Sequence, residues 1–310
     1  MRIVGNSSQL KEILGRAENL AGIPRPLLIR GERGTGKELL ASFIHSKSER
    51  GKGPFIDLNC AVYNEELLAS ELFGHEKGAF TGAESRYIGR LERAENGTLF
   101  FDEVGNMSPM FQAKLLRVIE NRTYDRVGGS KTLKTNARFI FATNADLESM
   151  MERGEFRRDF YDRIAFEILT LPPLRERKQD IPLLVEEFVN QLMREIPNFE
   201  PRFFTPEAMK QMLDYYWPGN IRELKNVVER LQLHEGEDII RTIDLPQEIT
   251  AASPRGDTFE EKVEAYKRHL IVSAWRDAHY NQKRAADILS MTYDQFRHYF
   301  KKYNLKDLSV

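Results

Sequence analysis

The chain has 310 residues, of which 41% are hydrophobic and 30% are charged, a balance typical of globular rather than disordered proteins. Its formal net charge of -1 excludes a chain that is basic throughout, so any nucleic-acid surface must be local. Its single cysteine, Cys60, excludes an intramolecular disulfide and a cysteine-based zinc site. The sequence shows neither a secretory leader nor an apolar run of membrane-spanning length, so we expect a cytoplasmic protein without a membrane segment.

The first half of the chain alternates between helical and strand patterns. Apolar residues at helical spacing predict a helix over 7–21. Short apolar runs then follow at 26–29, 55–58, 98–101, 139–142 and 168–169, and helical patterns lie between them at 37–45, 65–72, 111–119 and 147–153. This alternation predicts an α/β fold with a mainly parallel sheet over residues 1–172.

The pattern changes after the Pro172-Pro173 pair, where three successive stretches have only helical periodicity. We interpret residues 173–235 as a small all-helical subdomain. Residues 236–258 are polar and contain Pro246, Pro254 and Gly256, which is typical of a linker. The remaining residues, 259–310, are helical again and form the last predicted domain.

A glycine-rich segment follows the first apolar run and opens the next helix, which is the setting of a phosphate-binding loop. Its glycines let backbone N–H groups surround phosphates, and Lys37 would reach the β- and γ-phosphates of ATP. Glu38 stands where the general motif has a magnesium-binding hydroxyl. The alternative is a glycine turn before a helix. The candidate ATP-binding residues here are Gly31, Glu32, Arg33, Gly34, Thr35, Gly36, Lys37 and Glu38.

Two acids, Asp102 and Glu103, end the apolar run that starts at Thr98. Buried strands deliver functional residues at their carboxyl ends. We predict that Asp102 holds magnesium, directly or through water, and that Glu103 polarises the attacking water. A solvated acidic loop is the alternative.

Several motifs together carry a resemblance to a known family. Residues 78–83 read GAFTGA, and around them stand ELFGHE (71–76), FDE (101–103), LPPLRER (171–177) and WPGNIREL (217–224). In this order they resemble the motifs of bacterial sigma-54-dependent transcription activators, over about residues 5–235. The resemblance implies an AAA+ P-loop ATPase core with a helical lid. It also implies that the protein uses ATP and magnesium, and that it is a dimer at rest and assembles into a hexameric ring. The ring would remodel sigma-54 RNA polymerase holoenzyme from closed to open complexes.

The resemblance also implies roles for residues outside the glycine-rich loop and the Asp102-Glu103 pair. Asn59 resembles the residue that holds the catalytic glutamate, here Glu103, in a nucleotide-dependent switch. Thr143 and Asn144 look like the sensor I position that reads the γ-phosphate.

Three arginines complete the implied ATPase site. Arg157 and Arg163 resemble arginine fingers that reach a neighbouring subunit's nucleotide, and Arg222 resembles the sensor II arginine of the lid. A solvated charged face is the alternative for Arg157 and Arg163. Arg222 lies just after a predicted helix start, where the helix dipole disfavours a cation unless a phosphate offsets it.

The GAFTGA segment also makes physical sense as a contact loop. Its small residues leave Phe80 and Thr81 as the only substantial side chains, so it can change conformation and present one aromatic ring. The alternative is a flexible insertion whose Phe80 packs in the core. The candidate sigma-54 contacts are Gly78, Ala79, Phe80, Thr81, Gly82 and Ala83. We interpret His45, His75 and Cys60 as packing or surface residues.

Residues 281–289 resemble the first helix of a helix-turn-helix of the factor-for-inversion-stimulation type, with Ser290 and Met291 as the turn and 292–303 as the recognition helix. Ser290 replaces the glycine common in such turns. Residues 281–310 carry a local net charge of +3, which favours contact with enhancer DNA. We expect the upstream helix, about 259–279, to support dimerisation. A dimerisation element without DNA contact is the alternative. The candidate DNA contacts are Lys283, Arg284, Thr292, Tyr293, Gln295, Arg297, His298 and Lys301.

Two other functions remain open at this stage, namely a different AAA+ machine and a DNA-binding repressor that has lost activation. The predicted core begins within a few residues of Met1 and no sensing domain precedes it. We therefore expect control in trans by a separate repressor protein, unless the chain is a piece of a longer activator.

Overall fold

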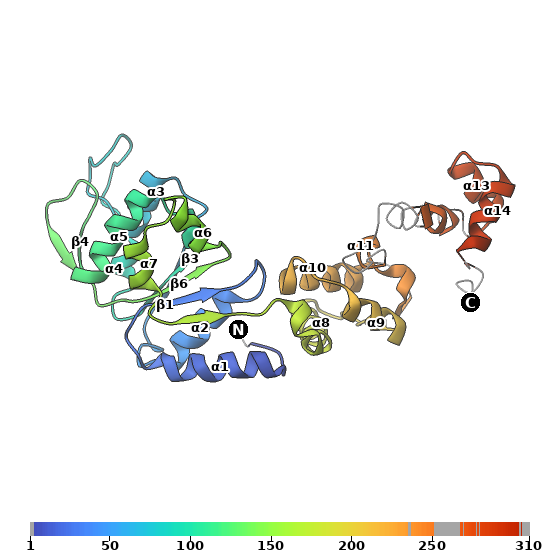
Figure 1. Ribbon diagram of the computed structural model, residues 1–310, viewed down its shortest axis with the longest axis horizontal. Coiled ribbons are helices and arrows are strands. Elements are labelled where there is room, and N and C mark those ends of the chain that lie inside the picture. Colours follow the sequence, from blue (N-terminus) through green and yellow to red (C-terminus); the bar gives the residue numbers. More distant parts are fainter. Residues whose placement is uncertain are drawn as a thin grey trace. The chain divides into compact units, whose positions relative to one another are not determined.

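The computed structural model describes residues 3–234, 237–250 and 267–305, apart from 269, 277, 279 and 304. The chain forms two compact units (Figure 1). The first comprises Met1–Asn198 with Trp217–Glu229, and the second comprises Phe199–Tyr216 with Arg230–Val310. In the part of the chain so described, no helix is long and apolar enough to cross a membrane.

The first unit is built on a parallel sheet of five strands in the order β2-β3-β6-β1-β7. Each strand begins and ends within one residue of the corresponding predicted apolar run. They are β1 (Leu27–Arg30), β2 (Phe55–Asn59), β3 (Thr98–Asp102), β6 (Arg138–Thr143) and β7 (Ile168–Thr170). Because all pairs are parallel, every strand ends at the same edge of the sheet.

Helices cover both faces of this sheet, as Figure 1 shows. Along β1, Leu27 and Ile29 pack on one face and Leu28 packs on the other, as strand geometry requires. The first face is covered by α1 (Ser8–Ala21) and α2 (Lys37–Lys47). The second is covered mainly by α3 (Glu65–Phe73), α4 (Arg90–Arg93), α5 (Pro109–Asn121), α6 (Leu147–Glu152) and α7 (Arg158–Ile164).

Two smaller elements of this unit lie outside the main layers. The 3-10 turn η1 (Val104–Asn106) follows β3, and β4 (Thr123–Asp125) pairs antiparallel with β5 (Thr132–Lys134).

The stretch that the sequence predicts to be helical contains the 3-10 turns η2 (Leu174–Glu176) and η3 (Lys178–Asp180) and the helices α8 (Ile181–Glu195), α9 (Pro206–Asp214) and α10 (Asn220–Leu233). The first compact unit holds α8, the second holds α9, and α10 crosses from the first to the second after Glu229. The helices α8 and α9 both carry a proline in their first turn, where its missing N–H costs no hydrogen bond. The three helical stretches expected from the sequence are therefore present as α8, α9 and α10.

Residues 237–250, which the sequence assigned to a linker, are structured instead. They form β9 (Ile239–Ile240), η4 (Thr242–Asp244) and α11 (Gln247–Thr250), and β9 pairs in parallel with β8 (Phe203–Phe204). The buried side chains of Ile240, Leu245 and Ile249 explain the difference, because three apolar anchors are enough to fold a polar segment onto its neighbours. Residues 251–258 of the predicted linker lie outside the described residues.

The C-terminal helices share a small aromatic core. Residues 270–276 are helical, and α13 (Gln282–Ile288) and α14 (Tyr293–Lys302) follow. The Trp275 ring packs edge-on against Phe300 at 4.7 Å between centroids, and Phe296 and Ala285 are buried beside them. Part of the predicted upstream helix, 259–266, lies outside the described residues.

Candidate nucleotide site and partner-binding loops

The glycine-rich segment forms a loop between β1 and α2. Gly34 and Gly36 have φ angles of 75° and 102°, a region that disfavours side chains with a Cβ atom. A Cβ atom at Gly34 would also collide with the carbonyl oxygen of Gly219. Since α2 begins at Lys37, the N-terminal end of a helix meets the loop, which is the arrangement that binds phosphate.

Lys37 lies buried at the centre of this loop. Its Nζ donates to the carbonyl oxygens of Gly31 at 3.0 Å and Glu32 at 3.3 Å, and it lies 4.0 Å from Glu103 Oε1. Burial lowers the pKa of Lys37, and the charges of Glu103 and Asp102 oppose that lowering. The lysine is therefore held by the loop itself, facing the end of β3.

The two predicted acids meet Lys37 from β3. Asp102 is the last residue of the strand, and its Oδ1 accepts a hydrogen bond of 3.0 Å from the Glu103 N–H. Glu103 has a left-handed backbone, with φ of 55°, which turns the chain sharply at the sheet edge. Burial and the neighbouring Glu103 raise the pKa of Asp102, whereas Lys37 lowers it. Such crowding of carboxylates suits a site that receives a cation.

Asn144 contacts the catalytic candidate directly. In the amide orientation that satisfies both of its polar atoms, Asn144 donates to both carboxylate oxygens of Glu103, at 3.2 Å for Oε1. Thr143, the last residue of β6, is fully buried, and its hydroxyl accepts a hydrogen bond of 3.0 Å from the Ala145 N–H. The sensor I candidates thus lie beside Glu103.

In this structure, the Asn59 side chain bonds to the backbone two residues further along the chain. Asn59 ends β2 in register with Asp102, and its Oδ1 accepts a hydrogen bond of 2.9 Å from the Ala61 N–H. In this structure Asn144, and not Asn59, supplies the amide hydrogen bond to Glu103.

Three residues that follow the sheet, Arg175, Arg177 and Asn220, form hydrogen bonds with the phosphate loop. The sequence alone assigned no role to them. Buried Asn220 donates to Arg33 O at 3.0 Å and Glu32 Oε2 at 3.1 Å, and Arg175 forms a two-point pair with the same Glu32 carboxylate at 2.6 and 2.8 Å. Buried Arg177 donates to Thr35 O at 2.9 Å. These residues lie within the motifs LPPLRER and WPGNIREL, which had already been identified in the sequence. Their contacts with the loop could not be predicted, because they join residues more than 140 positions apart.

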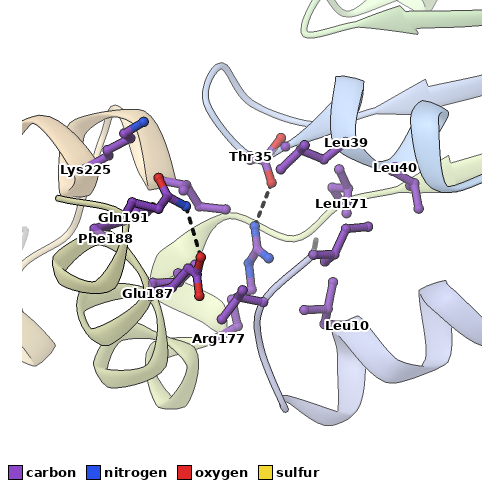
Figure 2. Close-up of a pocket in the computed structure, with 15 residues that line it drawn as sticks. Leu10, Thr35, Leu39, Leu40, Leu171, Arg177, Glu187, Phe188, Gln191 and Lys225 are labelled. Carbon is purple, nitrogen blue, oxygen red and sulfur yellow. Dashed lines mark hydrogen bonds between the residues drawn. The ribbon is translucent and has the colours of Figure 1, made fainter. Parts of the chain in front are cut away.

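An apolar cavity of about 140 Å³ adjoins the loop (Figure 2). Figure 2 shows Arg177 reaching the Thr35 backbone at its edge and Leu171 and Phe188 among its walls. Residues from the start of the chain, α2 and the lid form the rest of the lining, which includes Ile3, Val4, Leu39, Leu184 and Ile221. A cavity of this kind beside a phosphate loop is suited to the base of a nucleotide.

The three predicted arginines occupy different places. Arg222 lies beside the loop, with its Cβ 3.1 Å from the position that a Cβ of Gly34 would take, and its charge lowers the pKa of Lys37. Arg157 and Arg163 are exposed and pair with Asp159 at 2.6 Å and Glu120 at 3.1 Å. In the described residues, no contact joins them to the phosphate loop of their own chain.

The GAFTGA segment is an exposed loop with a fixed base. The Gly78 N–H donates to Ala83 O at 2.9 Å, which closes the loop. Phe80 is 45% exposed and its ring meets the His75 ring edge-on at 5.0 Å. The alternative of a core phenylalanine is therefore not supported.

The base of that loop is held on two sides. His75 stacks on Tyr87 with centroids 5.6 Å apart and pairs with Ser70 Oγ at 2.8 Å. Buried Arg126, which follows β4, pairs with Glu76 at 2.8 Å and Glu92 at 2.6 Å. These contacts fix the residues that flank the loop, whereas Phe80 and Thr81 at its tip are exposed.

The predicted DNA contacts lie on the exposed surface of α13 and α14. Thr292 caps α14 and Gln295 returns the hydrogen bond, so both side chains serve the helix N-terminus in addition to any ligand. Lys283 Nζ lies 6.0 Å from the Tyr293 ring centroid. Ser290, in the turn, has φ of 53°, the conformation that a glycine would adopt without strain. The remaining candidates, Arg284, Arg297, His298 and Lys301, are all exposed.

The parallel sheet, the phosphate loop after β1, the acids after β3 and the helical lid define a protein of the AAA+ P-loop class. Comparison with known proteins is more specific. Residues 3–170 match the family described as "Sigma-54 interaction domain", and residues 175–262 match "AAA+ ATPase lid domain". The chain belongs to the family of sigma-54-dependent transcriptional activators.

Individual relatives agree with this assignment. Over 98% of its length the chain is 49% identical to the Psp operon transcriptional activator of Escherichia coli K12, and it spans 98% of that protein. It is 40% identical to the Nif-specific regulatory protein of Azotobacter vinelandii, of which it spans 59%. Crystal structures of NtrX from Brucella abortus with ADP and with ATP are similar in fold, each with a TM-score of 0.74 and 32% identity. Both similarities cover 100% of this chain, and they cover 69% of the NtrX chain with ADP and 70% of the NtrX chain with ATP.

Proposed function

We propose that this protein hydrolyses ATP in a ring oligomer and uses the energy to convert closed complexes of sigma-54 RNA polymerase into open complexes. The observation that carries the proposal is the meeting of Lys37, Asp102 and Glu103 at one sheet edge in a chain that also presents an exposed GAFTGA loop. Membership of the sigma-54 family favours this reading over other AAA+ machines.

In the proposed ATPase reaction, the phosphate loop and Lys37 bind the phosphates and the apolar cavity takes the base. Asp102 would hold magnesium, which would shield the charge of the phosphates. The residues fit such an ion, because burial and the proximity of Glu103 raise the pKa of Asp102, an effect that a bound cation reverses. Glu103 would polarise the attacking water, and Asn144 would hold its carboxylate.

The ring is proposed because Arg157 and Arg163 are exposed and lie apart from the phosphate loop of their own chain. In a hexamer each would reach the neighbour's γ-phosphate, where an arginine stabilises the charge of the transition state. Phe80 and Thr81, at the exposed tip of the GAFTGA loop, would then contact sigma-54.

The decisive test is open-complex formation by the purified protein with sigma-54 holoenzyme and with sigma-70 holoenzyme. We expect ATP-dependent opening only with sigma-54, detected by permanganate reactivity of unpaired thymines. Bound promoters that stay closed in the presence of ATP would instead indicate a regulator that has lost activation.

We also propose that residues 259–310 form a helix-turn-helix domain that binds enhancer DNA. The exposed cations of α13 and α14 support this, and DNA affinity should fall steeply as salt increases. Removing these residues should abolish site-specific footprinting and leave ATP hydrolysis intact. Footprints that persist in the 1–258 fragment would refute this assignment.

Control of this activator by a separate repressor is a further part of the proposal. It rests on the similarity to the Psp operon activator over nearly the whole of both chains, which supports a role in the phage-shock response. Copurification of a protein that lowers ATP turnover would test it.

A further inference from the structure

The carboxylate of Asp180 is fully buried at the point where the lid begins. It accepts three hydrogen bonds from the start of the chain. Its Oδ1 accepts from the N–H groups of Asn6 at 2.7 Å and Ser7 at 2.8 Å, and its Oδ2 accepts from Ser7 Oγ at 2.7 Å. Hydrogen bonds to a buried carboxylate are among the stronger ones in proteins, so this contact fixes the backbone just before α1.

We name residues 3–7 the N-terminal strap. Two of them, Ile3 and Val4, form part of the lining of the apolar cavity beside the phosphate loop. The strap packs closely on Asp180, because a Cβ atom at Gly5 would lie 2.8 Å from the carboxylate carbon, and Gly5 also has φ of 148°. One wall of the cavity is therefore held in place by a residue of the lid.

Asp180 is also linked to the phosphate loop. It lies one 3-10 turn beyond Arg177, and its N–H donates to Arg177 O at 2.9 Å. Arg177 lines the same cavity and donates to Thr35 O (Figure 2). Burial lowers the pKa of Arg177 and the charge of Asp180 opposes this. The two buried residues thus connect the strap, the lid and the phosphate loop around one cavity.

We propose that Asp180 is a positioning residue that holds the N-terminal strap as a wall of the pocket for the nucleotide base. This inference rests on the proposed binding of ATP. The Asp180 carboxylate bonds to the strap and not to the glycine-rich loop in the described residues, so its loss should weaken only the part of binding that depends on the base. Inorganic tripolyphosphate, which has no base, separates the two contributions.

The experiment measures displacement of a fluorescent ATP derivative by ATP and by inorganic tripolyphosphate. We expect Asp180→Ala to raise the Kd of ATP about tenfold, the effect of losing one apolar wall, and to change that of tripolyphosphate less than about twofold. In steady-state hydrolysis the KM should rise by the same factor with kcat within about twofold.

Three further variants keep the result interpretable. Asp180→Asn can still accept from the strap amides and donate to Ser7 Oγ, so it should restore ATP affinity to within about threefold of the parent. Gly5→Ala displaces the strap without changing any charge and should behave like Asp180→Ala. Ser8→Ala, on the exposed neighbour of Ser7, is the matched control and should bind ATP as the parent does.

Equal weakening of ATP and tripolyphosphate would overturn the proposal, because the phosphate loop would then be the affected part. Parent-like ATP affinity in folded Asp180→Ala or Gly5→Ala would overturn it as well. If Asp180→Ala does not fold, Gly5→Ala and Ser7→Ala apply the same test, and a smaller loss of ATP affinity is expected for Ser7→Ala. Failure of the parent to bind ATP would refute the proposed function itself, which is a different outcome.

Discussion

Lys37 Nζ and Glu103 Oε1 face each other at 4.0 Å across the carboxyl edge of the sheet. The two groups should nevertheless contribute to different steps. The lysine neutralises charge that ATP carries in the ground state and in the transition state, whereas the glutamate acts only on the attacking water.

We therefore expect Lys37→Ala to lose nucleotide binding or hydrolysis and Glu103→Ala to keep binding and lose turnover. Equilibrium binding of a fluorescent nucleotide and steady-state ATPase rates measure the two effects. Parent-level hydrolysis by Glu103→Ala would show that another residue polarises the water.

Asn144→Ala should lower kcat and leave nucleotide affinity almost unchanged. The amide donates to both Glu103 oxygens, so its loss frees a carboxylate whose orientation matters for general-base chemistry. A loss of about tenfold corresponds to the typical value of one hydrogen bond to a charged group. Comparison with Asn59→Ala shows which amide controls Glu103, and a larger kcat loss for Asn59→Ala would favour a switch that forms only with nucleotide bound.

Mixing two inactive variants should restore part of the ATPase activity. Arg163→Ala subunits keep an intact Glu103, and Glu103→Ala subunits keep an intact arginine, so mixed interfaces can contain one complete site. An arginine finger accelerates turnover by about 10³-fold or more, so even a few mixed sites are detectable. If mixed rings form, as native mass spectrometry can show, and activity does not return, Arg163 does not act in trans.

Substitutions in the GAFTGA loop should separate ATP hydrolysis from remodelling. Thr81→Ala and Phe80→Ala both change an exposed loop tip, so we expect parent-like ATPase and ring assembly with loss of sigma-54 trapping by an ATP transition-state analogue. Phe80 is 45% exposed, and its removal should cost far less than the about 3–5 kcal/mol of a buried phenylalanine. An unfolded Phe80→Ala, or a Thr81→Ala that opens promoters normally, would refute the role assigned to the loop.

Ser290→Gly should raise the stability of the C-terminal helices. Ser290 has φ of 53°, and relief of a left-handed conformation contributes about 1 kcal/mol, partly offset by the greater freedom of glycine in the unfolded chain. Thermal unfolding of residues 259–310 measures the gain. A lower melting temperature would mean that the Ser290 side chain stabilises the turn more than its backbone strains it.

Much of the candidate nucleotide site could be predicted because its polar residues lie in short contiguous motifs. The phosphate loop and the Asp102-Glu103 pair each follow an apolar strand, and parallel strands bring them to one edge. The hydrogen bonds from Asn220 and Arg177 to that loop could not be predicted, because they join residues 142 to 188 positions apart. The choice of Asn144 rather than Asn59 as the partner of Glu103 likewise depends on side-chain direction, which no local pattern specifies.

The strand β6 lies between β1 and β3, so the phosphate loop and the two acids start from strands that are not neighbours. The backbones of β1 and β3 are about two strand spacings, or roughly 10 Å, apart. The side chains of Lys37 and Glu103 extend across that distance and approach to 4.0 Å. The backbone of β6 therefore sets the distance between β1 and β3, since β6 bonds to both strands along most of its length. A displacement of β6 would change the distance between substrate and catalytic acid while leaving each motif intact. Under the proposed function, a change in the twist of the sheet at β6 would therefore alter the rate of ATP hydrolysis without any change to a catalytic side chain.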